Sequence, residues 1–103
     1  FNYVGDSILG THVNLGAGTK LSNLKNDGSN VKTRIGEHIV DTGIRKFGAI
    51  LGDNCQLGCN SVTNPGTIME PNCKVYPCAS IQGHFERGSI VKLRQNIETA
   101  VLI

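Results

Sequence analysis

The sequence predicts an all-β chain wound as a parallel β-helix, and three observations lead to this prediction. From Leu51 to Ile81 the residues fall into units of six with one constant register. A small residue stands at the fifth position of every full unit, and Gly, Pro, Asn and Asp gather at the second and third positions. A period of six matches neither a helix nor a strand, whereas three such units make one triangular coil of about 18 residues.

Two columns of side chains are therefore expected inside the coil. The first positions of the units are Leu51, Leu57, Thr63, Met69, Val75 and Ile81, and the fifth positions are Cys55, Ser61, Thr67, Cys73 and Ala79. Gly or Asn is expected to take the positive-φ turns. An ordinary β-sandwich with frequent turns would not hold one register over this whole stretch.

A first repeat tract runs from Val4 to about Ser22. Leu9, Leu15 and Leu21 are spaced by six, and each of the first two is followed by Gly. Val13 and Thr19 fill the fifth position, and one unit near Val4 is a residue short.

Between residues 24 and 50 the register of six is lost. Asn26-Asp27-Gly28 is a turn signal, and Val31, Thr33 and Ile35 alternate with Lys32 and Arg34. The pattern predicts a β-hairpin arm that projects from the coil. Six cations and three anions lie in the arm and its flanks. This balance leaves two interpretations, a solvated loop or a phosphate-binding arm that reaches a neighbouring coil.

After Gly83 the repeat ends. Residues 84–88 are expected to form a turn and residues 89–93 one more strand, and residues 96–103 a short helix or a disordered end. The expected division is a β-helix domain over residues 1–94, with its arm at about 24–50, and a tail over 95–103.

Composition limits the function classes. A chain of 103 residues is one domain, and a net charge of +2 is too small to indicate nucleic-acid binding. No apolar run is long enough to cross a membrane and no signal peptide is visible. The cysteine usage fits a reducing, cytoplasmic compartment. A solenoid of this size leaves flat faces, which favours an oligomer.

The cysteines and histidines give no clear catalytic or metal pattern. Cys55 and Cys73 stand at interior positions, and the four cysteines contain no CxxC pair, so packing or surface thiols are favoured over a metal site. No Ser/His/Asp or Cys/His spacing stands out around His12, His38 or His84, each of which is more simply structural or exposed.

Three segments carry a family resemblance: FNYVGDSILG, VNLGAGTKLSNLKNDG and RKFGAILGD. Over about residues 1–94 the chain resembles the left-handed β-helix acetyltransferase domain of bifunctional sugar-1-phosphate nucleotidyltransferases, which include glucosamine-1-phosphate N-acetyltransferases. The arm and the RKFGA segment look most like the archaeal-type members. The resemblance implies left-handed coils, acetyl-CoA as cosubstrate, a sugar phosphate as acceptor and a homotrimer with its sites between chains.

The resemblance also implies roles for individual residues. Tyr3 matches the tyrosine of an H-x-x-Y-x-G-D motif that helps to bind the sugar phosphate, and Asn14 and Asn23 match asparagines of the acceptor pocket. Lys32 matches a lysine that meets the phosphate, whereas Ser29 stands where archaeal-type members can carry a further lysine. Ala17 and Cys59 fall where acetyl-CoA passes along the coil, and Arg94 matches a late arginine near its phosphate.

The motif histidine, which acts as general base in the family, would stand immediately before Phe1. No catalytic residue is therefore assigned within this chain, and the chain as given is expected to bind acetyl-CoA weakly and to turn over poorly. Two functions stay open: an N-acetyltransferase domain for an amino-sugar 1-phosphate, or a non-catalytic β-helix that trimerises and supports a nucleotidyltransferase. Another acyltransferase with a different acceptor is a third interpretation.

Overall fold

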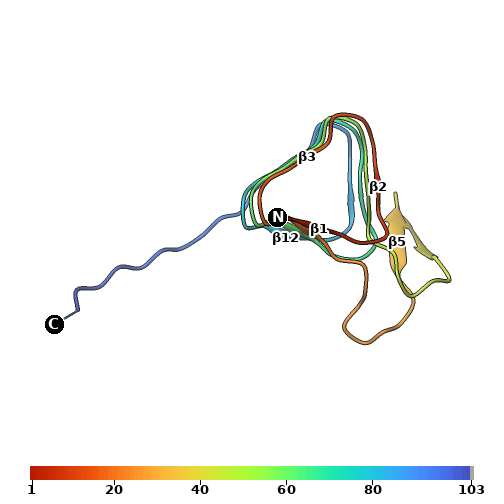
Figure 1. Cartoon of the computed structure of the whole chain (residues 1–103), viewed down its shortest axis with the longest axis horizontal. Helices are drawn as coiled ribbons and strands as arrows, with labels where there is room; N and C mark the ends of the chain where they lie inside the picture. Colours follow the sequence, from red (N-terminus) through yellow and green to blue (C-terminus); the bar gives the residue numbers. More distant parts are fainter. Residues whose placement is uncertain (103) are drawn as a thin grey trace.

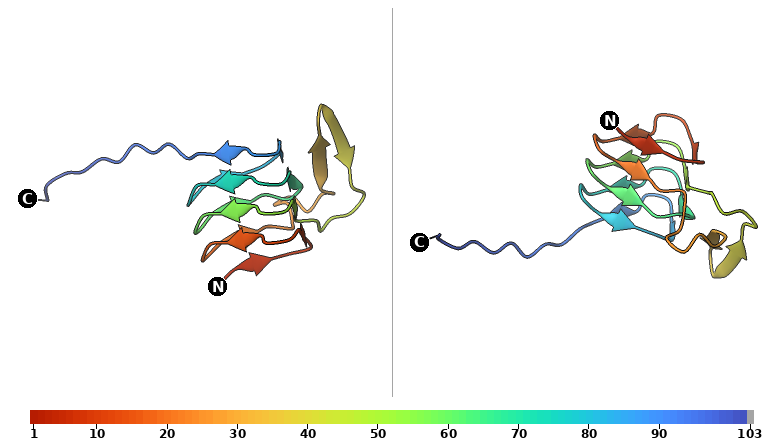
Figure 2. Two further views of the ribbon diagram at one scale, coloured as in Figure 1. Left: turned by 90° about the horizontal axis from the view of Figure 1, so that it is seen from above. Right: turned by 60° about the horizontal axis from the view of Figure 1, so that its bottom comes forward.

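Residues 1–102 are described by a computed structural model, in which the chain winds into stacked triangular coils (Figure 1). Seen from the N-terminal end, the chain turns counterclockwise as it recedes, so the β-helix is left-handed, as the resemblance implies (Figures 1 and 2). Ile103 lies outside the described residues, and with it the last position of the predicted tail.

Twelve short strands build three flat walls of four parallel strands each. The first wall contains β1 (Tyr3–Val4), β4 (Lys20–Leu21), β9 (Val62–Thr63) and β12 (Ser80–Ile81). The second wall contains β2 (Ile8–Leu9), β7 (Ala49–Leu51), β10 (Thr67–Met69) and β13 (His84–Phe85). The third wall contains β3 (Asn14–Leu15), β8 (Gln56–Leu57), β11 (Lys74–Val75) and β14 (Ile90–Val91).

The repeat of six sets the register of the walls. Gln56 pairs with Lys74 and Ala49 with Thr67, so a regular coil takes 18 residues. All the side chains predicted at the first and fifth positions from Leu51 to Ile81 are buried, the most exposed being Ile81 at 7%. The two predicted interior columns are confirmed. Leu9 is 36% exposed, because the first coil has a neighbouring coil on one side only.

The residues at the fourth position of each unit form a third column, and the sequence did not predict that the positive-φ turns would fall there. The backbone turns through positive φ at the fourth position of each unit, at Asn54, Asn60, Gly66, Asn72 and Cys78. Asn and Gly accept this conformation at little cost, but Cys78 adopts it without such a preference. Stacking on the coil below, where the Cys78 N–H donates to the Cys59 carbonyl over 2.9 Å, fixes the turn there.

The predicted arm is an antiparallel hairpin of β5 (Lys32–Ile35) and β6 (His38–Asp41). It projects beside the second wall (Figure 2). Ile8 pairs with Ile50 across the excursion, so the walls resume their register after it.

The predicted turn over residues 84–88 is wrong at its start. His84 and Phe85 form β13, which pairs with Ile68 and Met69. Gly83, at φ 110°, lets the corner be cut short, so this coil takes 16 residues and Phe85 reaches the interior sooner than the repeat of six allows. The strand expected within 89–93 is β14, and residues 92–102 form no helix or strand.

Candidate functional site

The first wall begins with a hydrogen-bonded chain of three polar side chains. The Tyr3 hydroxyl donates to Asn23 Oδ1 over 3.1 Å, and Asn23 Nδ2 donates to Asp6 Oδ2 over 2.6 Å. A β-carbon on Gly5 would lie 2.6 Å from Asn23 Cγ and 2.7 Å from the Tyr3 hydroxyl, so glycine is needed here for the two side chains to meet. Tyr3 is half exposed, which leaves its phenol free to contact a polar ligand.

The excursion over residues 24–50 and the coil line two adjoining cavities that share Gln82. A cavity of about 250 Å³ is lined by Lys32, Thr33, Arg34, Ile39, Gly66, Gln82 and Gly83. A second, of about 320 Å³, is lined by Leu24, Lys25, Asn26, Asp27, Asn64, Pro65 and Gln82. We call the pair the arm groove. Its charged side chains are three cations and Asp27, so it suits an anion.

Asp27 is the one carboxylate of the arm groove, and it is occupied locally. The Ser29 hydroxyl and backbone N–H both donate to Asp27 Oδ1, at 2.7 and 3.0 Å. These hydrogen bonds, with nearby Lys25, lower the pKa of Asp27. Ser29, where the resemblance allowed a lysine, therefore orders the turn at the base of the arm.

Two contacts fix the base and the middle of the hairpin. The Val31 side chain is fully buried, and the backbone N–H of Val31 donates to the Ile44 carbonyl over 2.9 Å. The buried Thr33 hydroxyl donates to the Gly66 carbonyl over 2.8 Å. Lys32 and Arg34, on either side of Thr33, are exposed and line the arm groove. The arm therefore docks on its own coil; the structure describes one chain, so the predicted reach to a neighbouring coil stays a prediction.

The corner between the third and first walls brings together two of the predicted cofactor positions. The Asn60 N–H donates to the Ala17 carbonyl, and the Cys78 N–H to the Cys59 carbonyl, both over 2.9 Å, so these residues stack coil on coil. Ala17, Cys59 and Cys78 are exposed. Arg94 is also exposed and follows β14, and the chain leaves the prism at this corner (Figure 1).

The predicted acceptor residues do not all meet on one chain. Tyr3 and Asn23 are in contact on the first wall, whereas Lys32 is on the arm and Asn14 is on the third wall. Asn14 lines a groove of about 440 Å³ with Lys74, Tyr76, Pro77 and Lys92, among other residues of the third wall. This groove adjoins the corner that carries Cys59, because Gly58 lines it too.

The thiols divide into two kinds. Cys55 and Cys73 are buried, and their thiols donate to the carbonyls of Glu70 and Glu86 at 3.4 and 3.1 Å. Burial raises the pKa of the Cys55 thiol, so it stays protonated. Cys59 and Cys78 are exposed free thiols. Among residues 1–102 no group of three or more His, Cys, Asp or Glu side chains could hold a metal ion.

Sequence reasoning missed several members of these surfaces. Asp6, Asn64 and Gln82 were not selected, although Asn64 and Gln82 stand at the same second position one coil apart, which is a usable signal. The pairing of His84 with Glu70 was also missed, because residue 84 was assigned to a turn.

The described residues form no helix with the length and apolar character needed to cross a bilayer.

Comparison with known proteins gives three informative relatives. The chain is 34% identical over 92 residues to a bifunctional sugar-1-phosphate nucleotidylyltransferase/acetyltransferase of Sulfurisphaera tokodaii, with 89% of this chain and 23% of that protein covered. It is 34% identical over 96 residues to the bifunctional protein GlmU of Methanocaldococcus jannaschii, covering 93% and 23%. It is 30% identical over 95 residues to an uncharacterized acetyltransferase, YaiX, of Escherichia coli, covering 92% and 41%.

No protein-family model matches the chain. The matches nevertheless confirm the resemblance identified from the sequence motifs, over about nine-tenths of this chain. The chain spans 23% of the length of the two bifunctional relatives.

Proposed function

We propose that this chain is an acetyl-CoA-dependent N-acetyltransferase domain that acts on an amino-sugar 1-phosphate, of the glucosamine 1-phosphate type. The observation that carries the proposal is the hydrogen bond between Tyr3 and Asn23. The resemblance assigned both residues to the acceptor pocket, although they are 20 residues apart in sequence. The relatives named as acetyltransferases, from Sulfurisphaera tokodaii and Escherichia coli, support the same reaction class.

The reaction also needs a place for the phosphate of the acceptor, and the arm groove is our candidate for it. Lys32 and Arg34 line one of its two cavities, and Lys25 lines the other. Cations on a docked hairpin lose less conformational freedom when they bind an anion than cations on a free loop. Asn26, Asn64 and Gln82, which also line the groove, could exchange hydrogen bonds with the sugar hydroxyls.

The corner of Ala17 and Cys59 fits an extended cosubstrate. Ala17 is small and exposed, and the adjacent third-wall groove carries Lys74 and Lys92, which suit the phosphates of coenzyme A. Acetyl-CoA bound along this corner would supply the thioester. Arg94, immediately before the tail, is our candidate for a further phosphate contact.

The chemical step is attack of the acceptor amine on the thioester carbonyl carbon, with loss of the coenzyme A thiol. The amine must lose a proton, because an ammonium has no free electron pair, and imidazole titrates in the required range. In residues 1–102, no hydrogen bond joins His12, His38 or His84 to the Tyr3–Asn23 pair. We therefore keep the proposal that the base is the motif histidine before Phe1.

The separation of Asn14 from Tyr3 and Asn23 supports a site shared between chains. On one chain they occupy different walls of the prism. Three copies packed wall to wall would place the third wall of one beside the first wall of another, so that Asn14 could complete its neighbour's pocket. A homotrimer is accordingly part of the proposal.

The test compares two chains: residues 1–103, and the same chain preceded by one histidine. Acetyl transfer to glucosamine 1-phosphate is expected from the extended chain and little from the other. Acetyl-CoA should stabilise both against unfolding, by about 2.7 kcal/mol at 100 times its dissociation constant. Equal, rapid turnover by the two chains would show that the base is placed wrongly, and galactosamine 1-phosphate as acceptor tests the sugar.

The alternative function is a non-catalytic β-helix that trimerises and supports a nucleotidyltransferase. The absence of a hydrogen-bonded imidazole at the Tyr3–Asn23 pair, within the described part of the chain, favours it. It predicts no stabilisation by acetyl-CoA in either chain. That result, together with a trimeric mass in solution, would replace the catalytic proposal with the structural one.

A further inference from the structure

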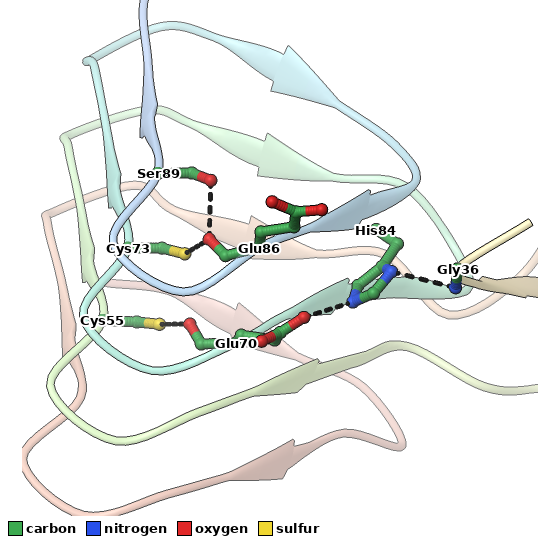
Figure 3. Close-up of polar contacts among 7 residues, drawn as sticks. All are labelled: Gly36, Cys55, Glu70, Cys73, His84, Glu86 and Ser89. Carbon is green, nitrogen blue, oxygen red and sulfur yellow. Dashed lines mark hydrogen bonds and ion pairs between the residues drawn. The ribbon is translucent and has the colours of Figure 1, made fainter.

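The tip of the hairpin is hydrogen-bonded to an imidazole on the coil (Figure 3). The Gly36 N–H donates to His84 Nδ1 over 3.2 Å, and His84 Nε2 lies 2.8 Å from Glu70 Oε2. Because Nδ1 accepts a hydrogen bond, the ring proton of the neutral imidazole is on Nε2 and is donated to the Glu70 carboxylate. Both ring nitrogens are thereby occupied, so His84 holds the tip and does not serve as a free base.

This arrangement depends on the shortened last coil. His84 pairs with Ile68, and Glu70 projects two residues farther along the same strand direction, which makes it the diagonal neighbour of His84. With a regular coil of 18 residues, Glu86 would stand where His84 does, and the imidazole would be absent from this place. Two carboxylates would then face each other, so the 16-residue coil is what gives the hairpin tip its acceptor.

We propose that His84, held by Glu70, is a positioning residue for the arm groove; this inference rests on the proposed binding of a phosphate there. Thr33 is fixed to Gly66, and Gly36 is fixed to His84, so Arg34 lies between two fixed points of β5. Gln82 and Gly83, which immediately precede His84, line the same cavity as Arg34. The Gly36–His84 hydrogen bond, together with that of Thr33 to Gly66, therefore holds the two sides of this cavity at a fixed distance.

Protonation of His84 removes this hydrogen bond. An imidazolium carries protons on both nitrogens, so Nδ1 can no longer accept from the Gly36 N–H, while Nε2 keeps its contact with Glu70. β13 packs against β10 and β5, on or next to which the charged groups are Glu70, Lys32 and Arg34. Glu37 and His38 follow at the tip of the hairpin. Glu86 and Arg87 follow on its own segment. Among residues 1–102, the tip turn 36–37 makes no other hydrogen bond to the coil, so this contact alone ties the tip to it.

The first experiment observes the hydrogen bond itself by NMR on the ¹⁵N-labelled chain. We expect a scalar coupling between the Gly36 amide nitrogen and His84 Nδ1, and an Nε2–H tautomer at neutral pH. Both signatures should vanish together as the ring becomes protonated. An Nδ1–H tautomer at neutral pH, or a missing coupling, would overturn the proposal whatever the protein binds.

The second experiment measures the affinity of the chain for sulfate, an anion whose charge does not change near neutral pH. His84→Asn keeps an acceptor near the position of Nδ1, and His84→Gln keeps a polar group near that of Nε2; neither titrates. At pH 8 we expect H84N to bind within about twofold of the unchanged chain and H84Q about fivefold more weakly, the equivalent of one hydrogen bond.

Glu86→Gln is the matched control, because the Glu86 side chain is exposed and takes no part in the contact to Gly36 (Figure 3). It should keep the sulfate affinity of the unchanged chain. Equal affinities of H84N and H84Q, both folded by circular dichroism, would overturn the positioning role. If no variant binds sulfate or glucosamine 1-phosphate, the proposed phosphate site fails, and the NMR coupling still decides whether His84 holds the tip.

Discussion

At the scale of the residue, the buried threonine hydroxyls of the coil interior differ in whether they find a hydrogen-bond partner. Thr67 is fully buried, and its hydroxyl donates to the Asn64 carbonyl over 2.7 Å. Thr63 is equally buried, between Leu21 and Ile81 of the neighbouring coils, but its hydroxyl has no partner among the described residues. The same residue type therefore has opposite energetic consequences at the first and fifth positions of one unit.

This contrast gives the first stability prediction. Thr63→Val removes an unpaired buried hydroxyl and should raise the free energy of unfolding by about 1 kcal/mol. Thr67→Val breaks a hydrogen bond and leaves the Asn64 carbonyl with one donor fewer, so it should lower that free energy by about 1 kcal/mol. Urea unfolding of both variants measures the difference. A loss of stability in T63V would mean that the hydroxyl is paired in solution.

Residue-scale prediction from sequence was good for the columns and poor for the exceptions. Leu51, Met69 and the small residues between them follow from spacing alone, because a stacked coil repeats its environment every unit. Cys78 at φ 65° does not follow, since the coil below it, and not its own preference, fixes the turn. The Asn23–Asp6 hydrogen bond was missed for the same reason: it needs the three-dimensional closeness of a corner.

At the scale of the element, the arm depends on a glycine of the coil. Gly66 has φ +90°, and an added β-carbon would collide with the Lys32 carbonyl oxygen. Gly66→Ala should therefore lower the free energy of unfolding by about 2–4 kcal/mol and displace β5. Gly43→Ala is the control, because Gly43 also has positive φ, +73°, but nothing lies near its β-carbon.

The control should cost only the backbone strain, about 1–2 kcal/mol. Denaturant unfolding gives the two free energies, and the amide signals of residues 32–41 report whether the hairpin stays docked. Equal losses in the two variants would show that close packing of the hairpin against Gly66 contributes nothing.

The existence of the hairpin could be read from the alternation of Val31, Thr33 and Ile35, but its docking could not. Sequence shows that a segment leaves the register; it does not show which wall the segment then meets. The strand at His84–Phe85 was hidden because its register is set by pairing with Ile68 and Met69 across a shortened coil. Both failures concern contacts between segments that the repeat of six does not relate.

At the scale of the whole molecule, the described tail is separate from the prism. Residues 95–102 are exposed, form no strand or helix and project away from the coils (Figure 2). No hydrogen bond of the described residues joins them to a wall. The fold should therefore be complete without them.

Removal of residues 95–103 is expected to change the free energy of unfolding by less than about 0.5 kcal/mol. Removal from residue 90 onward also deletes β14, which pairs with Lys74 and Val75, and should be clearly destabilising. Urea unfolding at two protein concentrations compares the shortened chains. A large loss from the first truncation would indicate that the tail packs on another copy.

One feature of the second wall has a consequence for diversification. Leu9 stacks directly on Leu51 although the whole excursion lies between them in sequence. The register of the walls therefore does not depend on which segment is inserted at that corner, provided that both ends of the segment return to adjacent coils. Relatives could exchange this insert for one of another length or charge as a cassette, and so acquire a new small-molecule preference without rebuilding the solenoid that carries it.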